Sequence, residues 1–91
     1  MSTKDRHSLE AILEAISKIH RFTKTHPNHE SFFNDERDFD AVMMNFIMIG
    51  EMVSRISQGL KVANPQIEWN RIKGFRNMVA HDYFGIDAEE V

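Results

Sequence analysis

Residues 35–62 constrain the fold of this chain more than any other stretch of its sequence. Apolar residues recur there at every third or fourth position, so on an α-helix they form one continuous stripe. The residues of this stripe are Phe39, Val42, Met43, Phe46, Ile49, Gly50, Val53, Ile56 and Leu60. Three methionines, Met44, Met48 and Met52, form a second stripe on nearly the opposite side. We therefore predict one long helix with two apolar sides.

Two apolar sides require two packing partners, because the outer side of a surface helix in a small monomer is normally polar. One partner is the protein's own core. The other is either a second copy of the chain or a set of further helices that enclose the central one. Methionine side chains fill irregular gaps between proteins, and few helices are available to enclose this one. We therefore expect a homodimer with Met44, Met48 and Met52 at its interface.

The rest of the chain is also helical in pattern. Apolar residues with helical spacing predict a first helix over residues 5–25, which Pro27 ends. Residues 31–38 are then a link into the central helix, and a third helix follows over residues 69–81. A fourth helix should begin near Ala88. The sequence predicts an all-α fold.

Length and composition exclude several classes of protein. The 91 residues suffice for a single domain, 1–91, and there is no cysteine, so disulfides and thiolate metal sites are excluded. The N-terminus is polar and no apolar run could span a membrane, so we expect a cytoplasmic protein without a membrane partner. A net charge of −3 argues against binding nucleic acid through bulk charge. A nucleic-acid site would need local positive charge, for which the candidates are Arg55, Lys61, Arg71, Lys73 and Arg76.

The stretch 73–85 contains arginine, histidine and tyrosine in close succession, as Arg76, His81 and Tyr83. Arginine suits phosphate, and histidine exchanges a proton near neutral pH. The combination suggests phosphodiester chemistry without a metal or other cofactor. Five positions on a regular helix are about 140° and ~7.5 Å apart, so Arg76 and His81 do not share a face. Either the helix loosens near Ala80 or two copies of the chain complete the site; alternatively, both are ordinary helix-end residues.

The motif residues resemble those of the HepT-like family of HEPN proteins, the ribonuclease toxins of MNT/HepT toxin–antitoxin systems. The matching segments are Asp35-Glu36-Arg37, Ile49-Gly50-Glu51, Ile67-Glu68-Trp69, Gly74-Phe75-Arg76-Asn77 and Ala80-His81-Asp82-Tyr83-Phe84-Gly85-Ile86-Asp87. The resemblance implies a HEPN-type antiparallel helical bundle that dimerises and cleaves RNA without metal. It also implies a type VII toxin whose partner is a nucleotidyltransferase antitoxin.

Roles for the motif residues follow from this resemblance and from the chemistry of RNA cleavage. His81 would act as general acid or base, and Arg76 would neutralise charge on the phosphate. Asn77 would orient the phosphate or the histidine, and Tyr83 would bound the pocket. In the family, the motif tyrosine is also where the antitoxin attaches adenylyl groups, so Tyr83 is the expected site of AMPylation.

Other interpretations stay open at the level of sequence. Family members continue into a terminal helix, whereas this sequence stops at Val91, so the last helix is expected to be cut short. The chain would then be a truncated form, or a partner would complete its core. A different class of function is a catalytically idle helical dimer that serves as a nucleotidyltransferase-binding module; another is a domain that binds a nucleotide phosphate through Arg76. The remaining histidines are expected to be ordinary surface or helix-end residues, with no metal site: His7, His20, His26 and His29.

Overall fold

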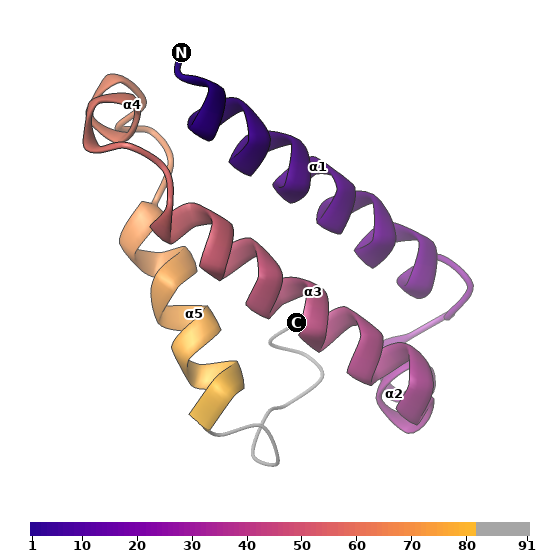
Figure 1. Cartoon of the computed structure of the whole chain (residues 1–91). Helices are drawn as coiled ribbons and strands as arrows, with labels where there is room; N and C mark the ends of the chain where they lie inside the picture. The colour runs from indigo at the N-terminus through magenta and orange to yellow at the C-terminus, as the bar shows by residue number, and fades with distance from the viewer. Residues whose placement is uncertain (82–91) are drawn as a thin grey trace.

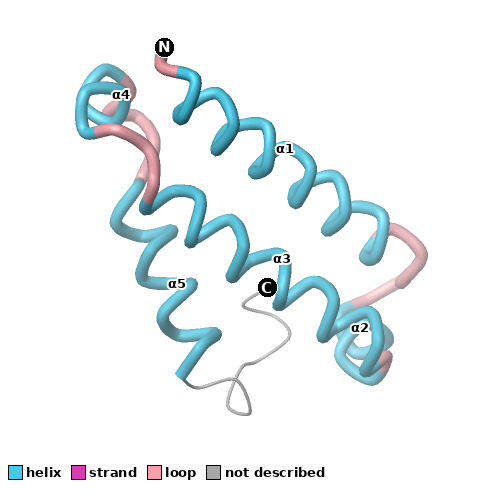
Figure 2. The backbone as a smooth tube through the Cα atoms, viewed as in Figure 1, coloured by secondary structure: helices cyan, strands magenta, loops and turns pink. Residues whose placement is uncertain are grey.

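The computed structural model describes residues 1–81, and within that range the chain is helical, with no strand. Its elements, in chain order, are α1 (Thr3–Thr23), α2 (His29–Asn34), α3 (Glu36–Ser54), α4 (Gln58–Ala63) and α5 (Trp69–His81). Helix α3 lies in the middle, with α1 along one side and α5 along the other, and it runs opposite to both (Figures 1 and 2). The all-α prediction is confirmed, as are the first and third helices to within two residues.

The segment between the first two predicted helices was expected to be a link but contains the short helix α2. Asn28 begins this helix by accepting a hydrogen bond from the backbone N–H of Ser31 at 2.9 Å. Asp35 then ends α2 and starts α3, since its carboxylate accepts from the N–H of Asp38 at 3.0 Å. Two polar caps seven positions apart therefore favour a short helix of six residues between them.

The predicted helix over residues 35–62 is wrong after Ser54, because α3 ends there and a separate helix α4 begins after Ser57. The Ser57 hydroxyl accepts from the N–H of Leu60 and so acts as the N-cap of α4. Asp5 of α1 holds Ser57 in this position: its carboxylate accepts from the Ser57 N–H at 2.9 Å and from the Ser57 hydroxyl at 2.6 Å. A residue near the start of the chain thus fixes the break.

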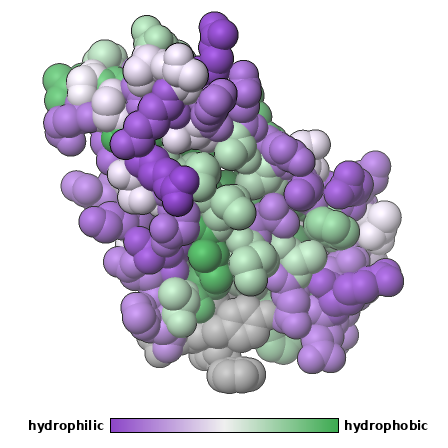
Figure 3. Space-filling model, in the orientation of Figure 1, coloured by the Kyte–Doolittle hydropathy of each residue, from purple (hydrophilic) through white to green (hydrophobic). Residues whose placement is uncertain are grey.

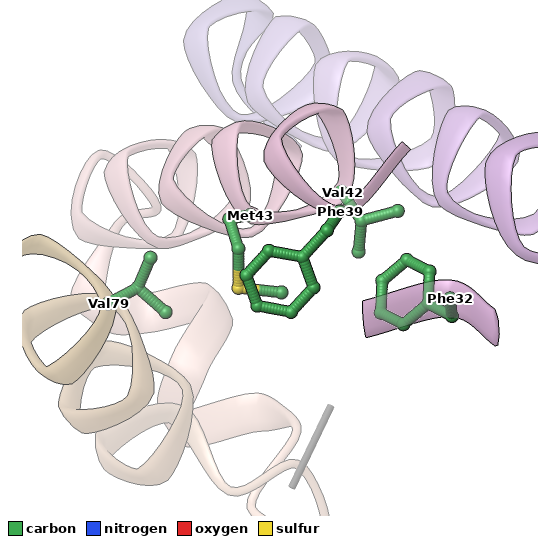
Figure 4. Packing of buried hydrophobic residues seen from close by; sticks show 5 residues of the cluster. All are labelled: Phe32, Phe39, Val42, Met43 and Val79. Atoms are coloured by element: carbon green, nitrogen blue, oxygen red, sulfur yellow. The ribbon is translucent and has the colours of Figure 1, made fainter. Parts of the chain in front are cut away.

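The core lies between α3 and its neighbours and uses the predicted apolar stripe. Phe32, Phe39, Val42, Met43 and Val79 form one buried cluster, in which Val79 of α5 points toward Met43 of α3 (Figure 4). Full burial of a side chain such as Val42, Met43 or Val79 stabilises the fold by about 1.5–3 kcal/mol. Ala15 of α1 packs with Ile49 and Val53 in a second cluster. Apolar packing on both sides therefore fixes the position of α3.

The methionine stripe remains open to solvent within this chain. Met44 is 62% exposed and Met48 is 44% exposed, whereas Met52 is half-buried. Hydrophobic side chains also run through the middle of the face shown in Figure 3, with hydrophilic residues on both sides. The alternative in which helices of the same chain enclose α3 on all sides is therefore wrong for the described residues.

Two further predictions concern membrane spans and a fourth helix. None of the helices described in residues 1–81 combines the length and hydropathy that a bilayer-crossing segment needs. The fourth helix predicted near Ala88 lies outside the described residues.

Candidate functional site

The predicted site lies on α5, and an aromatic residue anchors the start of that helix. The indole N–H of Trp69 donates to the backbone carbonyls of Lys61 and Asn64, at 3.3 and 3.2 Å. Further along, the rings of Phe75 and Phe46 pack edge to face with centroids 5.0 Å apart. Together with Val79, these contacts fix both ends of α5 against the rest of the protein. The side chains on α5 therefore have defined directions.

Arg76 points toward α3 and lies in a seam between the two helices. Its Nη1 is 3.2 Å from Oε1 of Glu51, and its side chain is only 23% exposed. Its stem passes over Gly50 so closely that a Cβ at position 50 would overlap the Cβ and Cγ of Arg76. The Nε of Arg76 is buried and has no hydrogen-bond partner among the described residues. Arg76 is therefore held across a helix interface, and the interpretation of this residue as an ordinary helix-end cation is wrong.

His81 is the last described residue of α5 and is exposed. The helix stays α-helical through this residue, so the alternative in which it loosens near Ala80 is wrong. On a regular helix His81 is about 140° around the axis from Arg76. One copy of α5 therefore does not place Arg76 and His81 on a common face.

The other predicted site residues are exposed or lie outside the described part of the chain. Asn77 is exposed on α5, next to Arg76. Tyr83 lies outside the described residues, and nothing in the structure locates it. Of the neighbouring cations, Lys73 is exposed, and Arg71 pairs with Glu68 at 3.0 Å with both side chains largely in solvent.

An open cavity of about 590 Å³ lies near the first half of α5. Its lining is mainly apolar, with polar side chains at Gln66, Glu68 and Arg71. Neither Arg76 nor His81 lines it. The candidate site is a surface around Arg76 and His81.

The structure contradicts one prediction about the histidines. His26, expected to be an ordinary surface residue, has a side chain only 10% exposed and lies among carboxylates. Its Nε2 is 2.8 Å from Oδ2 of Asp38 and 3.9 Å from Oδ2 of Asp35, and its Nδ1 is 2.9 Å from the hydroxyl of Ser31. His26, Asp35 and Asp38 could hold a divalent cation, since their ligand atoms lie within 4.8 Å of one another. Their mutual hydrogen bonds already satisfy both ring nitrogens, so this cluster is explained as a polar staple between α2 and α3.

Sequence reasoning also missed the two residues that contact Arg76. Gly50 had been assigned to the apolar stripe, and Glu51 had no role beyond the resemblance. A signal was present, because glycine inside a helix is unfavourable by roughly 0.5–1 kcal/mol relative to alanine and often marks a close approach of backbone.

Comparison with known proteins gives a consistent result. A family model described as ribonuclease HepT-like matches residues 12–91. The chain is 33% identical over 88 residues to a protein named probable ribonuclease HepT from Thermococcus cleftensis, in a match that covers 97% of this chain and 79% of the relative. A putative RNase of Methanocaldococcus jannaschii is 34% identical over 88 residues, covering 96% and 80%. A second one from that organism is 34% identical over 76 residues, covering 84% and 62%. No solved structure matches the chain.

Proposed function

Because the chain belongs to the HepT-like ribonuclease family and has the all-α HEPN fold, we propose that it is an endoribonuclease that cleaves RNA through Arg76 and His81. The observation that carries this proposal is the position of Arg76. A guanidinium that is fixed by one carboxylate through Nη1 and still 23% exposed has further N–H donors with which to bind an anion. The anion proposed here is the scissile phosphate.

The proposed reaction uses the 2′-hydroxyl of RNA as its nucleophile. A base takes the proton of this hydroxyl, the 2′-oxygen bonds to phosphorus, and the bond from phosphorus to the 5′-oxygen breaks. An acid protonates the leaving oxygen, so the products carry a 2′,3′-cyclic phosphate and a 5′-hydroxyl. His81 serves as acid or base, and Arg76 neutralises the charge that accumulates on the phosphate oxygens. Asn77 orients the phosphate or the histidine. No metal ion takes part in the proposed steps.

A homodimer would bring the separated groups together. On α3, Met44, Met48 and Glu51 share one helix face, since they are spaced by four and three residues. Glu51 in turn holds Arg76. A second copy that covers the exposed methionines would therefore lie next to Arg76 and could bring its own His81 toward it. In a twofold dimer both sites would form in the same way. We propose this arrangement with Met44, Met48 and Met52 at the interface.

The proposed biological role is that of a toxin in a type VII toxin–antitoxin system, in the cytoplasm. Its partner would be a nucleotidyltransferase antitoxin that transfers adenylyl groups from ATP to Tyr83. Each added AMP brings a negative phosphate to the region where RNA phosphate must bind, so it blocks and repels the substrate.

Purified protein tested on RNA in the presence of a chelator decides whether this function is correct. We expect the wild type to cleave RNA in chelator and to leave a 2′,3′-cyclic phosphate end, because no step needs a metal. His81→Ala should lose the activity with its helical content unchanged by circular dichroism.

Two results would contradict the proposal. Loss of wild-type cleavage in chelator would mean that the chemistry requires a metal ion. Equal cleavage by His81→Ala would mean that other residues, or a contaminant, carry the activity. A wild type that is idle toward RNA but binds a nucleotidyltransferase would instead support the alternative function as a binding module.

A further inference from the structure

Arg76 is the most tightly surrounded charged side chain of α5, and both residues that surround it belong to α3. Gly50 is buried in the second half of α3, where its missing side chain leaves room for the Arg76 stem. Glu51, the next residue, is about half exposed and reaches the guanidinium from the solvent side. The two residues act on different parts of the same arginine.

The remaining glycines of the described helices show that this contact is specific. A Cβ added at Gly59 or Gly74 would meet no heavy atom within 4 Å, whereas one added at Gly50 would overlap Arg76. The overlapping atoms are the Cβ and Cγ of Arg76, which lie close to the backbone of α5 and have little freedom to move aside. A side chain at position 50 therefore requires α5 or Arg76 to shift.

The ion pair between Glu51 and Arg76 also differs from the other pairs. Arg71 and Glu68 are 82% and 68% exposed, and a pair of that kind contributes little. Arg76 is 23% exposed, so water competes less for its contact with Glu51. Arginine has a long flexible stem, and a carboxylate that fixes the guanidinium removes much of that freedom before any ligand arrives. Glu51 is placed to preorganise Arg76.

We propose that Gly50 and Glu51 are positioning residues for Arg76, Gly50 by accommodating its stem and Glu51 by fixing the direction of its guanidinium. The inference rests on the proposed ribonuclease function, in which Arg76 contacts the scissile phosphate. Glu51 carries a negative charge beside that phosphate, so it does not contribute to substrate affinity. Its effect is on the turnover of bound RNA, because a displaced catalytic group slows a reaction by up to about a hundredfold.

The experiment compares steady-state cleavage of an RNA oligonucleotide by three variants of the full chain. Glu51→Ala should lower kcat about tenfold to a hundredfold without raising KM, because the phosphate loses a repulsive neighbour while Arg76 loses its anchor. Glu51→Gln keeps an oxygen acceptor at the same place and should recover part of the lost kcat. Gly50→Ala should lower kcat at least as much as Glu51→Ala.

Two matched controls separate these effects from general ones. Glu14→Gln removes the same charge from an exposed ion pair with Lys18 on α1. Gly59→Ala adds the same methyl group where nothing lies within 4 Å. Both controls should cleave at the wild-type rate. Gly50→Ala is interpreted only if its circular dichroism and unfolding midpoint show a folded protein, and the Glu51 variants carry the test if it is not folded.

A second measurement needs no cleavage. The Nε–H of Arg76 should give a nitrogen-15-edited NMR signal that exchanges slowly with water, and the signal is assigned by its absence in Arg76→Lys. Glu51→Ala should accelerate that exchange, and Glu14→Gln should not. If the wild type fails to cleave RNA, the proposed function fails, and this signal still decides whether Glu51 orders Arg76. The positioning role is overturned by unchanged exchange in Glu51→Ala, or by a kcat for Glu51→Ala equal to or above that of the wild type.

Discussion

The two sides of α3 differ in how their buried polar groups are hydrogen-bonded. On the side of α1 and α2, Asp5 and Asp38 are buried polar residues with side-chain partners: Asp5 binds Ser57 just before α4, and Asp38 binds His26, which also contacts Ser31. Where α5 meets α3, Arg76 has one carboxylate partner and a buried Nε without any among the described residues. The first side is complete as a scaffold. The second side leaves one buried N–H without a partner among the described residues, which is uncommon in a protein interior.

The largest effect on RNA cleavage is expected from substituting Arg76, on the side of α3 that meets α5. Arg76→Lys keeps the charge but loses the planar fork, and removal of one such donor lowers the rate of phosphate or acyl chemistry by about 10²–10³-fold. The measurement is the rate of RNA cleavage at saturating substrate. Arg37→Lys, at a side chain 91% exposed on α3, is the control and should leave the rate unchanged. Equal rates in both variants would remove the guanidinium of Arg76 from the reaction.

A similarly large loss of RNA cleavage is expected when AMPylation blocks the proposed site. A cognate nucleotidyltransferase with ATP and magnesium should raise the mass of the protein by whole AMP units and silence its cleavage of RNA. Tyr83→Phe should be neither modified nor silenced by this route. Mass spectrometry that places the adduct on another residue would defeat the prediction. Inhibition without ATP would point to steric masking by the partner instead.

A smaller effect is expected from the exposed methionines, which form the proposed contact with a second copy. Met48→Asp would bury an unpaired charge in the proposed interface and cost several kcal/mol, so the dimer should dissociate at least about a hundredfold more readily. Light scattering should then report the mass of one chain. Ser17→Asp, at an exposed position of α1, is the control and should not change the mass. An unchanged mass for Met48→Asp, with helicity intact, would exclude the methionines from an interface.

A substitution on the side of α3 that meets α1 and α2 should lower the stability of the protein and leave its activity unchanged. His26→Ala leaves the buried Asp38 carboxylate without its imidazole partner, which costs about 1–3 kcal/mol. The measurement is the free energy of unfolding in urea, compared with His20→Ala, which removes an exposed histidine from α1. Cleavage per folded molecule should stay at the wild-type level. A variant as stable as the wild type would show that the staple between α2 and α3 contributes nothing to stability.

The smallest effect is expected in the pH dependence of the free energy of unfolding. Hydrogen bonds from the Ser57 hydroxyl and backbone lower the pKa of Asp5 below its ordinary value of 3.8. The stabilising contribution of Asp5 is therefore present above pH 3.8 and is lost as the pH falls through the lowered folded pKa. Ser57→Ala removes the larger of these bonds, so its unfolding free energy should fall less steeply with acid in this window. Parallel curves for wild type and Ser57→Ala would contradict the assignment.

The sequence was sufficient to predict what depends on local periodicity and on the motif. The apolar stripe of α3 is buried as expected, since Val42, Met43 and Val53 are nearly inaccessible. The extent of α5 was also predicted, because its pattern has the same period throughout. The exposure of Met44 and Met48 followed from their place opposite the stripe. These features can be predicted without knowing which helices pack against each other.

The features that were missed depend on contacts between residues far apart in the chain. Asp5 binds Ser57 at the break after Ser54, and nothing near Ser57 in the sequence indicates that bond. His26 gains its carboxylate neighbours only when α2 folds back onto the start of α3. Glu51 meets Arg76 only when α5 packs on α3. Helical periodicity identifies which sides are buried, but it does not identify which polar groups meet there.

The bond between Asp5 and Ser57 also has a consequence for the order of folding. Before α1 docks, Ser57 has no carboxylate partner, and residues 36–63 are free to form one continuous helix. The loop that this contact closes spans more than half of the described chain, so its closure costs more conformational entropy than forming a turn of helix. We expect α4 to separate from α3 only in the last step of folding. A variant lacking Asp5 should then bypass that step and refold with fewer kinetic phases.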